Sequence, residues 1–171
     1  MMISAFHKVH MRYPEYTLEI YGEGSERKIL QDQIDQLNLK DNAFLCGFTD
    51  DIFDKMRDCA MYVCSSDYEG ISNALMEAMA MGVPSISTDC PIGGARAMIQ
   101  DGANGLLVPV GDVDTLASAM FRLISEPLFA QKLADQAWQS MREYDIKEIA
   151  NQWLNVMSGA MKGTVLSGER D

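Results

Sequence analysis

Two glutamates, Glu69 and Glu77, lie eight residues apart around the start of a predicted helix. The run 61–64 (Met-Tyr-Val-Cys) before them has no polar alternation, which is typical of a strand buried on both faces. Ser72 is a residue type that often caps a helix, and a glycine and a proline follow the apolar positions, so we expect a helix over about 73–81. The glutamates therefore flank a strand-to-helix turn.

The chemistry of this turn suits a ligand that carries both phosphate and hydroxyl groups. A helix that opens at Gly70, Ile71 and Ser72 leaves its first N–H groups free and presents the positive end of its dipole, so it can bind a diphosphate. Carboxylates repel phosphate but accept hydrogen bonds from hydroxyls. A glutamate on each side of the turn thus fits a nucleotide diphosphate sugar, which has a polyol at both ends. A lone carboxylate stabilising the helix dipole is the simpler alternative for Glu69.

The composition excludes several classes of protein. With 171 residues, 47% of them hydrophobic, the chain is long enough for one domain with its own core. A formal charge of −11 argues against nucleic acid or an anionic membrane surface as the main partner. The four cysteines show no C-x-x-C spacing and three fall in or beside apolar segments, so we expect buried, reduced thiols and a cytoplasmic location. No signal peptide or membrane span is visible.

Strands and helices alternate along the chain. Residues 1–12 are predicted to form a helix that turns Ile3, Phe6, Val9 and Met11 inward. Strands are predicted at 17–21, 43–46, 61–64 and from 85, with helices between them, which is the pattern of an α/β fold with a parallel sheet and right-handed crossovers. Ligands lie beyond the carboxyl ends of such strands. We therefore expect the loops at Gly22, Gly47, 65–70 and 88–94 to converge.

Three other possible sites, for a dinucleotide, a metal ion and a phosphate, have less support in the sequence than the turn between Glu69 and Glu77. The glycines at 22 and 24 suggest a dinucleotide site, but Arg27 occupies the place of the third glycine. His7 and His10 could share a metal, although no further ligand is near in sequence and a solvated helix face explains them better. Arg96 could meet a phosphate or simply face solvent. The apolar stripe of the last helix is normally a packing surface; it comprises Ile146, Ile149, Ala150, Trp153, Val156 and Met157.

Residues 69–80 resemble a known motif, the E-x7-E element of retaining, nucleotide-sugar-dependent glycosyltransferases with the GT-B fold, the family 4 or group 1 proteins. Four further segments match in order, between about Met1 and Tyr144. They are Tyr21-Gly22-Glu23-Gly24, Cys46-Gly47-Phe48, Gly82-Val83-Pro84-Ser85-Ile86 and Asp101 to Val108. The resemblance implies that the chain is the Rossmann-like, C-terminal, donor-binding half of such an enzyme, over residues 1–162. Residues 163–171 at the chain end are expected to form a disordered tail.

The resemblance also implies roles for single residues. Glu69 would be the catalytic residue and contact the donor sugar near its reacting carbon, and Glu77 would bind the ribose hydroxyls. No metal and no cofactor is implied, because the leaving diphosphate itself helps to deprotonate the acceptor. Relatives commonly carry a glutamate where Ala97 stands, so no role is transferred to that position. The implied donor-binding residues are Gly22, Gly24, Gly47, Phe48, Glu69, Gly70, Ile71, Ser72, Asn73 and Glu77.

The resemblance covers half of such an enzyme. An N-terminal domain for the acceptor, a first strand and the two cations that hold the donor diphosphate have no counterpart in these residues. We therefore expect a fragment that binds a UDP- or GDP-linked sugar without transferring it, and that would reach the inner membrane only through the absent domain. A sugar-nucleotide epimerase of the GT-B type and a non-catalytic nucleotide-binding module remain as alternatives.

Overall fold

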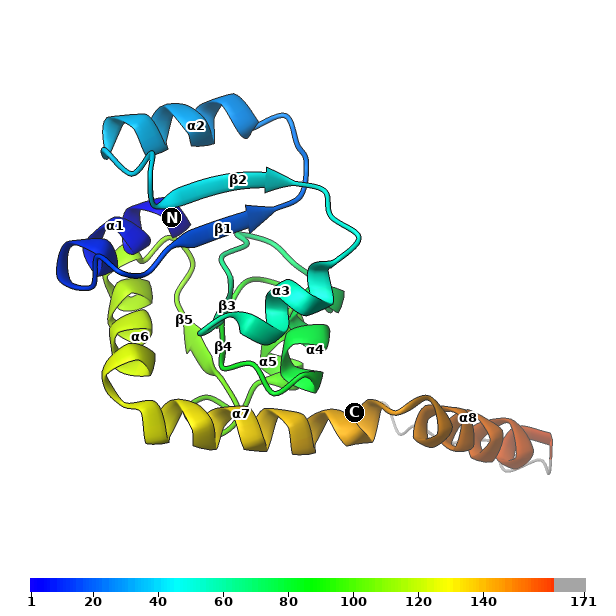
Figure 1. Ribbon diagram of the computed structural model, residues 1–171. Helices are drawn as coiled ribbons and strands as arrows, with labels where there is room; N and C mark the ends of the chain where they lie inside the picture. The colour runs from blue at the N-terminus through cyan, green and yellow to red at the C-terminus, as the bar shows by residue number, and fades with distance from the viewer. Residues whose placement is uncertain (162–171) are drawn as a thin grey trace.

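The computed structural model describes residues 1–161, and side chains as far as residue 159. The expected tail at 163–171, and the last residue of the expected domain, lie outside the described residues. The described residues form five short strands, each linked to the next by a helix, and three α-helices and a 3₁₀ turn follow the last strand; Figure 1 shows their arrangement. The strands are β1 (Leu18–Tyr21), β2 (Ala43–Gly47), β3 (Tyr62–Cys64), β4 (Ser85–Thr88) and β5 (Leu106–Val108).

The helices start and stop where the sequence provides caps. Ser72 caps α4 by accepting a hydrogen bond from the Leu75 N–H, Asp112 caps α6 by accepting one from the Thr115 N–H, and Pro127 opens α7. The expected helix over about 73–81 is therefore confirmed. The helices are α1 (Met2–Arg12), α2 (Arg27–Gln36), α3 (Ile52–Asp58), α4 (Asn73–Ala80), α5 (Gly94–Met98), α6 (Val113–Ser125), α7 (Pro127–Met141), the 3₁₀ turn η1 (Arg142–Tyr144) and α8 (Ile146–Met161).

All strand pairs are parallel, which confirms the α/β fold, but the strands form two sheets and not one. β1 pairs with β2, and β4 pairs with β3 on one side and β5 on the other. No ladder joins β1 to β3 in the part of the chain that the structure describes. Only β4 has a partner on both sides, so β3 is less buried than its apolar sequence predicts: Cys64 is buried, whereas Tyr62 and Val63 are half-buried.

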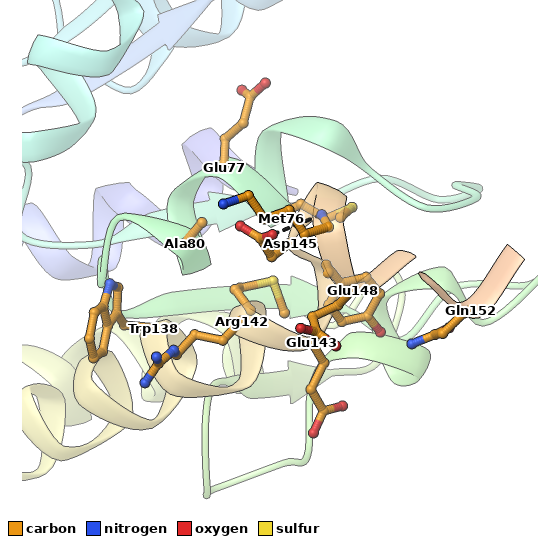
Figure 2. A pocket seen from close by; sticks show the side chains of 12 residues that line it. Met76, Glu77, Ala80, Trp138, Arg142, Glu143, Asp145, Glu148 and Gln152 are labelled. Atoms are coloured by element: carbon orange, nitrogen blue, oxygen red, sulfur yellow. Dashed lines mark hydrogen bonds between the residues drawn. The ribbon is translucent and has the colours of Figure 1, made fainter. Parts of the chain in front are cut away.

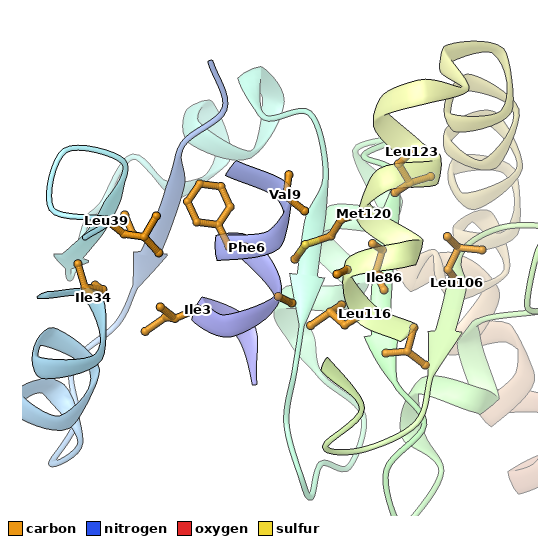
Figure 3. Close-up of a cluster of buried hydrophobic side chains, with 14 of the residues drawn as sticks. Ile3, Phe6, Val9, Ile34, Leu39, Ile86, Leu106, Leu116, Met120 and Leu123 are labelled. Carbon is orange, nitrogen blue, oxygen red and sulfur yellow. The ribbon is translucent and has the colours of Figure 1, made fainter. Parts of the chain in front are cut away.

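One apolar core nonetheless spans both sheets. Figure 3 shows Ile3, Phe6 and Val9 of α1 between Ile34 and Leu39 on one side and a group from α6, β4 and β5 on the other. These three α1 side chains are buried, as expected. Met11 was expected to face inward but is 75% exposed, because the buried stripe of α1 already ends at Val9.

The expectation of buried thiols needs correction. Cys64 and Cys90 are buried free thiols, but Cys46 and Cys59 are exposed, because β2 is uncovered on one face and Cys59 follows the end of α3. Much of the apolar stripe of α8 is uncovered: Ile146, Trp153, Val156 and Met157 are exposed. In Figure 1, α8 extends away from the rest of the fold.

Candidate functional site

Glu69 lies on the loop between β3 and α4, and neighbouring strands hold this loop in place. The Ser66 hydroxyl donates a hydrogen bond to the Glu69 carboxylate at 3.2 Å. Thr88, which is buried at the end of β4, donates to the main-chain oxygen of Ser66 at 2.5 Å. The Cys90 thiol makes a longer contact of 3.9 Å with the Glu69 main-chain oxygen. The carboxylate is therefore positioned from the carboxyl end of β4.

A glycine contact brings the next loop against the same turn. Gly94, the first residue of α5, is buried, and a Cβ atom there would lie 1.8 Å from the main-chain oxygen of Gly70. Glycine is thus required for this close approach. The expected convergence of loops 65–70 and 88–94 is confirmed by this contact and by the Thr88 bond.

Helix α4 begins where the sequence predicted. α4 starts at Asn73, with Ser72 as the N-cap, so Gly70 and Ile71 belong to the preceding loop. Ser72 satisfies the Leu75 N–H at 3.4 Å, which leaves the amides of Asn73 and Ala74 at the open end of the helix. Ile71 is 60% exposed, and Asn73 is exposed as well. An anion could therefore reach this turn from solvent.

Tyr62 of β3 is half-buried near the two glutamates, and the sequence analysis did not single it out. Burial raises the pKa of its phenol, and the negative charges of Cys64, Glu69 and Glu77 raise it further, whereas a hydrogen bond with Ser72 acts in the opposite direction. Tyr62 thus lies within electrostatic reach of both glutamates and stays a neutral hydrogen-bonding group. A polar side chain in an apolar strand directly before the motif was the available signal.

Gly22 and Gly47 meet at the carboxyl ends of β1 and β2. The Gly22 N–H donates to the Gly47 main-chain oxygen at 2.8 Å, and Gly47 has a left-handed φ of 71°. A Cβ at Gly47 would lie 2.6 Å from the Glu23 carboxylate. Gly24 and Phe48 are exposed nearby, Phe48 by 79%. These loops converge as expected, but no hydrogen bond or ion pair within residues 1–161 joins them to the Glu69 loop.

A further cavity lies away from this turn. An open groove of about 890 Å³ separates α4 and α7 from η1 and α8. Of the predicted site residues only Glu77 lines it, and Figure 2 shows the Glu77 carboxylate pointing away from the other labelled side chains, such as Arg142 and Glu143. The groove exists because α8 diverges from the fold, so we assign the candidate site to the Glu69 turn.

The turn has few cations around it. Arg96 forms an ion pair with Asp89, so its charge is already compensated, and its side chain is 70% exposed.

Among the described residues, no group of three or more His, Cys, Asp or Glu side chains is placed to hold a metal ion. None of the described helices has the length and apolar character needed to cross a membrane.

The family model described as "Glycosyl transferases group 1" matches residues 1–126. This chain belongs to that family. It is 28% identical to the poly(glycerol-phosphate) alpha-glucosyltransferase of Bacillus subtilis strain 168, over 88% of this chain and 22% of the relative. The chain thus spans less than a quarter of that relative's length.

Solved structures agree with this family assignment. An Anabaena protein, Alr3699/HepE, in complex with UDP superposes with a TM-score of 0.84 at 26% identity, over 92% of this chain and 44% of that one. The C-terminal domain of the group 1 family protein LpcC from Francisella tularensis superposes with a TM-score of 0.76 at 28% identity. The match covers 85% of this chain and 78% of that one. The fold is that of the C-terminal, Rossmann-like half of GT-B glycosyltransferases.

Proposed function

We propose that this chain is the donor-binding domain of a retaining glycosyltransferase. The complete enzyme would pass a sugar from a nucleotide diphosphate sugar to a saccharide or lipid-linked acceptor in polysaccharide or glycoconjugate synthesis. One observation carries the proposal: Glu69 is held by Ser66 on a loop that β4 and α5 anchor, directly before the open N-terminus of the helix that carries Glu77. Family membership and the UDP bound to the Anabaena neighbour support it.

The proposed roles follow the chemistry of each group. The Glu69 carboxylate accepts hydrogen bonds from the donor sugar near the reacting carbon, and Glu77 accepts them from the ribose. Amides of Gly70, Ile71, Ser72 and Asn73 hold sugar and phosphate oxygens. The strand-end glycines Gly22, Gly24 and Gly47, with Phe48, lie on the nucleotide side. The UDP of the neighbour favours a uridine nucleotide over a guanosine nucleotide.

Transfer would need a second domain. In the proposed reaction the bond from the anomeric carbon to the diphosphate breaks while the acceptor oxygen attacks from the same face. The acceptor's proton passes to the leaving diphosphate, so the scheme uses no metal and no cofactor. A partner domain must hold the acceptor and screen the diphosphate charge, because Arg96 on α5, next to this turn, is paired with Asp89. The complete enzyme would act in the cytoplasm, at the inner membrane surface when that domain attaches there.

Calorimetric titration of the chain with UDP, GDP and ADP tests this function. We expect weak, selective binding of UDP that Glu77→Ala weakens further. Glu148→Ala is the matched control, because Glu148 lines the same groove as Glu77 without belonging to the proposed site. Amide shifts of an NMR titration should cluster at the Gly22, Gly47 and 69–73 loops. Absence of binding at millimolar nucleotide, or shifts clustered around α8, would refute the proposal.

A further inference from the structure

The loop between β4 and α5 contains a strained residue, Ile92. Its φ of 77° lies in the left-handed region, which β-branched residues avoid because the Cβ atom comes too close to the following carbonyl oxygen. The Gly93 N–H donates to the Cys90 main-chain oxygen at 3.2 Å and closes a four-residue turn. Pro91 is the second residue of this turn and Ile92 the third. A proline followed by a positive φ is typical of a type II turn, whose third residue is usually glycine or asparagine.

Burial does not compensate for this strain. The Ile92 side chain is 68% exposed, and in the described structure it belongs to none of the three buried apolar clusters. The other non-glycine residue with a positive φ in the described part of the chain is Asn38, at 56°. Asn38 follows the last residues of α2, where asparagine commonly adopts this conformation. The conformation of Asn38 is thus explained by the helix end, whereas that of Ile92 has no such local cause.

The residues on both sides of Ile92 are fixed by the fold. Cys90 is buried, and its thiol lies 3.9 Å from the Glu69 main-chain oxygen. Gly94 is buried as well, and a Cβ atom there would lie 1.8 Å from the Gly70 main-chain oxygen. The chain must therefore turn between these two anchors, and the turn holds Ile92 on the loop that contacts the Glu69 turn. Strained residues that their surroundings hold in this way cluster at active sites and ligand-binding sites.

The chemistry of a sugar ring fits an exposed isoleucine on this loop. The Glu69 carboxylate can accept hydrogen bonds from hydroxyl groups, which lie around the rim of a pyranose ring. The faces of the same ring carry C–H groups, and an apolar side chain that covers them removes apolar surface from water. Isoleucine offers such a surface. The glycine or asparagine that would relieve the strain at position 92 does not offer it.

We propose that Ile92 contacts the sugar of the donor and packs against the apolar face of its pyranose ring. This role depends on the donor-binding function proposed above, and it adds a residue that recognises the sugar and not the nucleotide. Ile92 takes no part in bond breaking. It raises the affinity for a nucleotide sugar above the affinity for the bare nucleotide.

Variants of Ile92 separate the strain from the binding contact. Ile92→Gly and Ile92→Asn adopt a positive φ readily, so we expect their melting temperatures to rise by about 2–4 °C. UDP-glucose and UDP-N-acetylglucosamine serve as probes in calorimetric titrations, with UDP as the reference. Affinity for the probe that the wild-type chain binds more tightly should fall about fourfold, the effect of exposing roughly one methylene group, while affinity for UDP stays unchanged.

Two further variants are controls. Ile92→Val keeps both the strain and an apolar surface, so its melting temperature and its affinities should resemble those of the wild-type chain. Val110→Asn makes a matched change at another exposed β-branched residue, which is 39% exposed and does not have a positive φ. It should neither raise the melting temperature nor change any of the affinities.

Four outcomes would contradict the role of Ile92. Ile92→Gly and Ile92→Asn chains that melt higher but bind the UDP-sugar as tightly as wild type would show that the strain serves no contact with the sugar. An equal loss of UDP affinity would show that the turn shapes the nucleotide site as a whole. Melting temperatures that do not rise would show that Ile92 is not strained. Equal affinity of the wild-type chain for UDP and both UDP-sugars would refute this role alone, whereas binding of none of them would refute the proposed function as well.

Discussion

Gly94 lies so close to Gly70 that no other residue fits, since a Cβ would lie 1.8 Å from the Gly70 main-chain oxygen. Gly94→Ala must displace the loop that carries Glu69. We expect a loss of about 1–3 kcal/mol in the free energy of unfolding, the usual cost of overpacking, together with weaker nucleotide binding. Urea unfolding and a UDP titration measure both effects. Gly159→Ala is the control, because its Cβ would meet nothing within 4 Å. Equal stability of the two variants would contradict the prediction.

Ser66→Ala removes the hydrogen bond that orients the Glu69 carboxylate. Because Glu69 is proposed to contact the sugar, affinity for a UDP-sugar should fall by about 0.5–1.5 kcal/mol while affinity for UDP stays unchanged. Calorimetric titrations with UDP and with UDP-glucose measure these two affinities separately. Ser65→Ala removes a neighbouring hydroxyl that is equally half-buried and should change neither affinity. A parallel loss of UDP binding would show that Ser66 supports the loop as a whole.

Glu77 should distinguish ribose from deoxyribose. A site built to accept hydroxyl hydrogen bonds leaves an acceptor unpaired when the hydroxyl is absent, at a cost of roughly 1–3 kcal/mol. UDP should therefore bind more tightly than 2′-deoxy-UDP, and Glu77→Ala should remove the difference. Competition titrations with both nucleotides check this. A preference that persists in the variant would exclude Glu77 from the ribose site.

The raised pKa of Tyr62 leads to a prediction about how the stability of the chain changes in alkaline solution. Burial raises its pKa in the folded chain, so the unfolded chain loses the Tyr62 proton near pH 10.0 while the folded chain retains it. The unfolded state then binds fewer protons, and the free energy of unfolding falls as the pH rises above 10, by up to about 1.4 kcal/mol per pH unit for one group. Tyr62→Phe should lessen this slope in urea unfolding series.

The control for Tyr62 is Tyr68→Phe, because the Tyr68 side chain is 69% exposed. Tyr21 contributes to the slope in both variants, since its hydrogen bond to Glu19, with a small contribution from burial, also raises its pKa. The comparison between variants therefore isolates Tyr62. Identical slopes would mean that the Tyr62 phenol is not protected in the folded chain.

The chain by itself should bind donor without transferring sugar. Orientation of two reactants in a closed cleft can supply about 7–11 kcal/mol of the barrier, and this chain provides one side of the proposed cleft. A radiolabelled UDP-sugar assay with mixed saccharide and lipid acceptors measures transfer. Turnover that is lost in Glu69→Ala would show that the domain is catalytically sufficient.

The helices, the strands and the glutamate motif could be predicted from the amino-acid sequence, because they depend on local patterns. Apolar runs, glycine and proline stops, and the caps Ser72 and Asp112 are read within a few residues, and they place the helices and strands close to their observed bounds. The spacing of Glu69 and Glu77, together with four further segments in matching order, was likewise sufficient to indicate the family, which the match over residues 1–126 confirms.

The contacts that hold the site and the division of the sheet could not be predicted from the sequence, because both join residues that are far apart in the chain. The bond from Thr88 to Ser66 spans 22 residues, and the contact of Gly94 with Gly70 joins two loops, so no local pattern contains them. The apolar run 61–64 predicted a strand covered on both sides, but burial depends on neighbours. β3 has a neighbour on one side, β4, and its other edge faces β1 without pairing, because pairing is set by the position of strands in space.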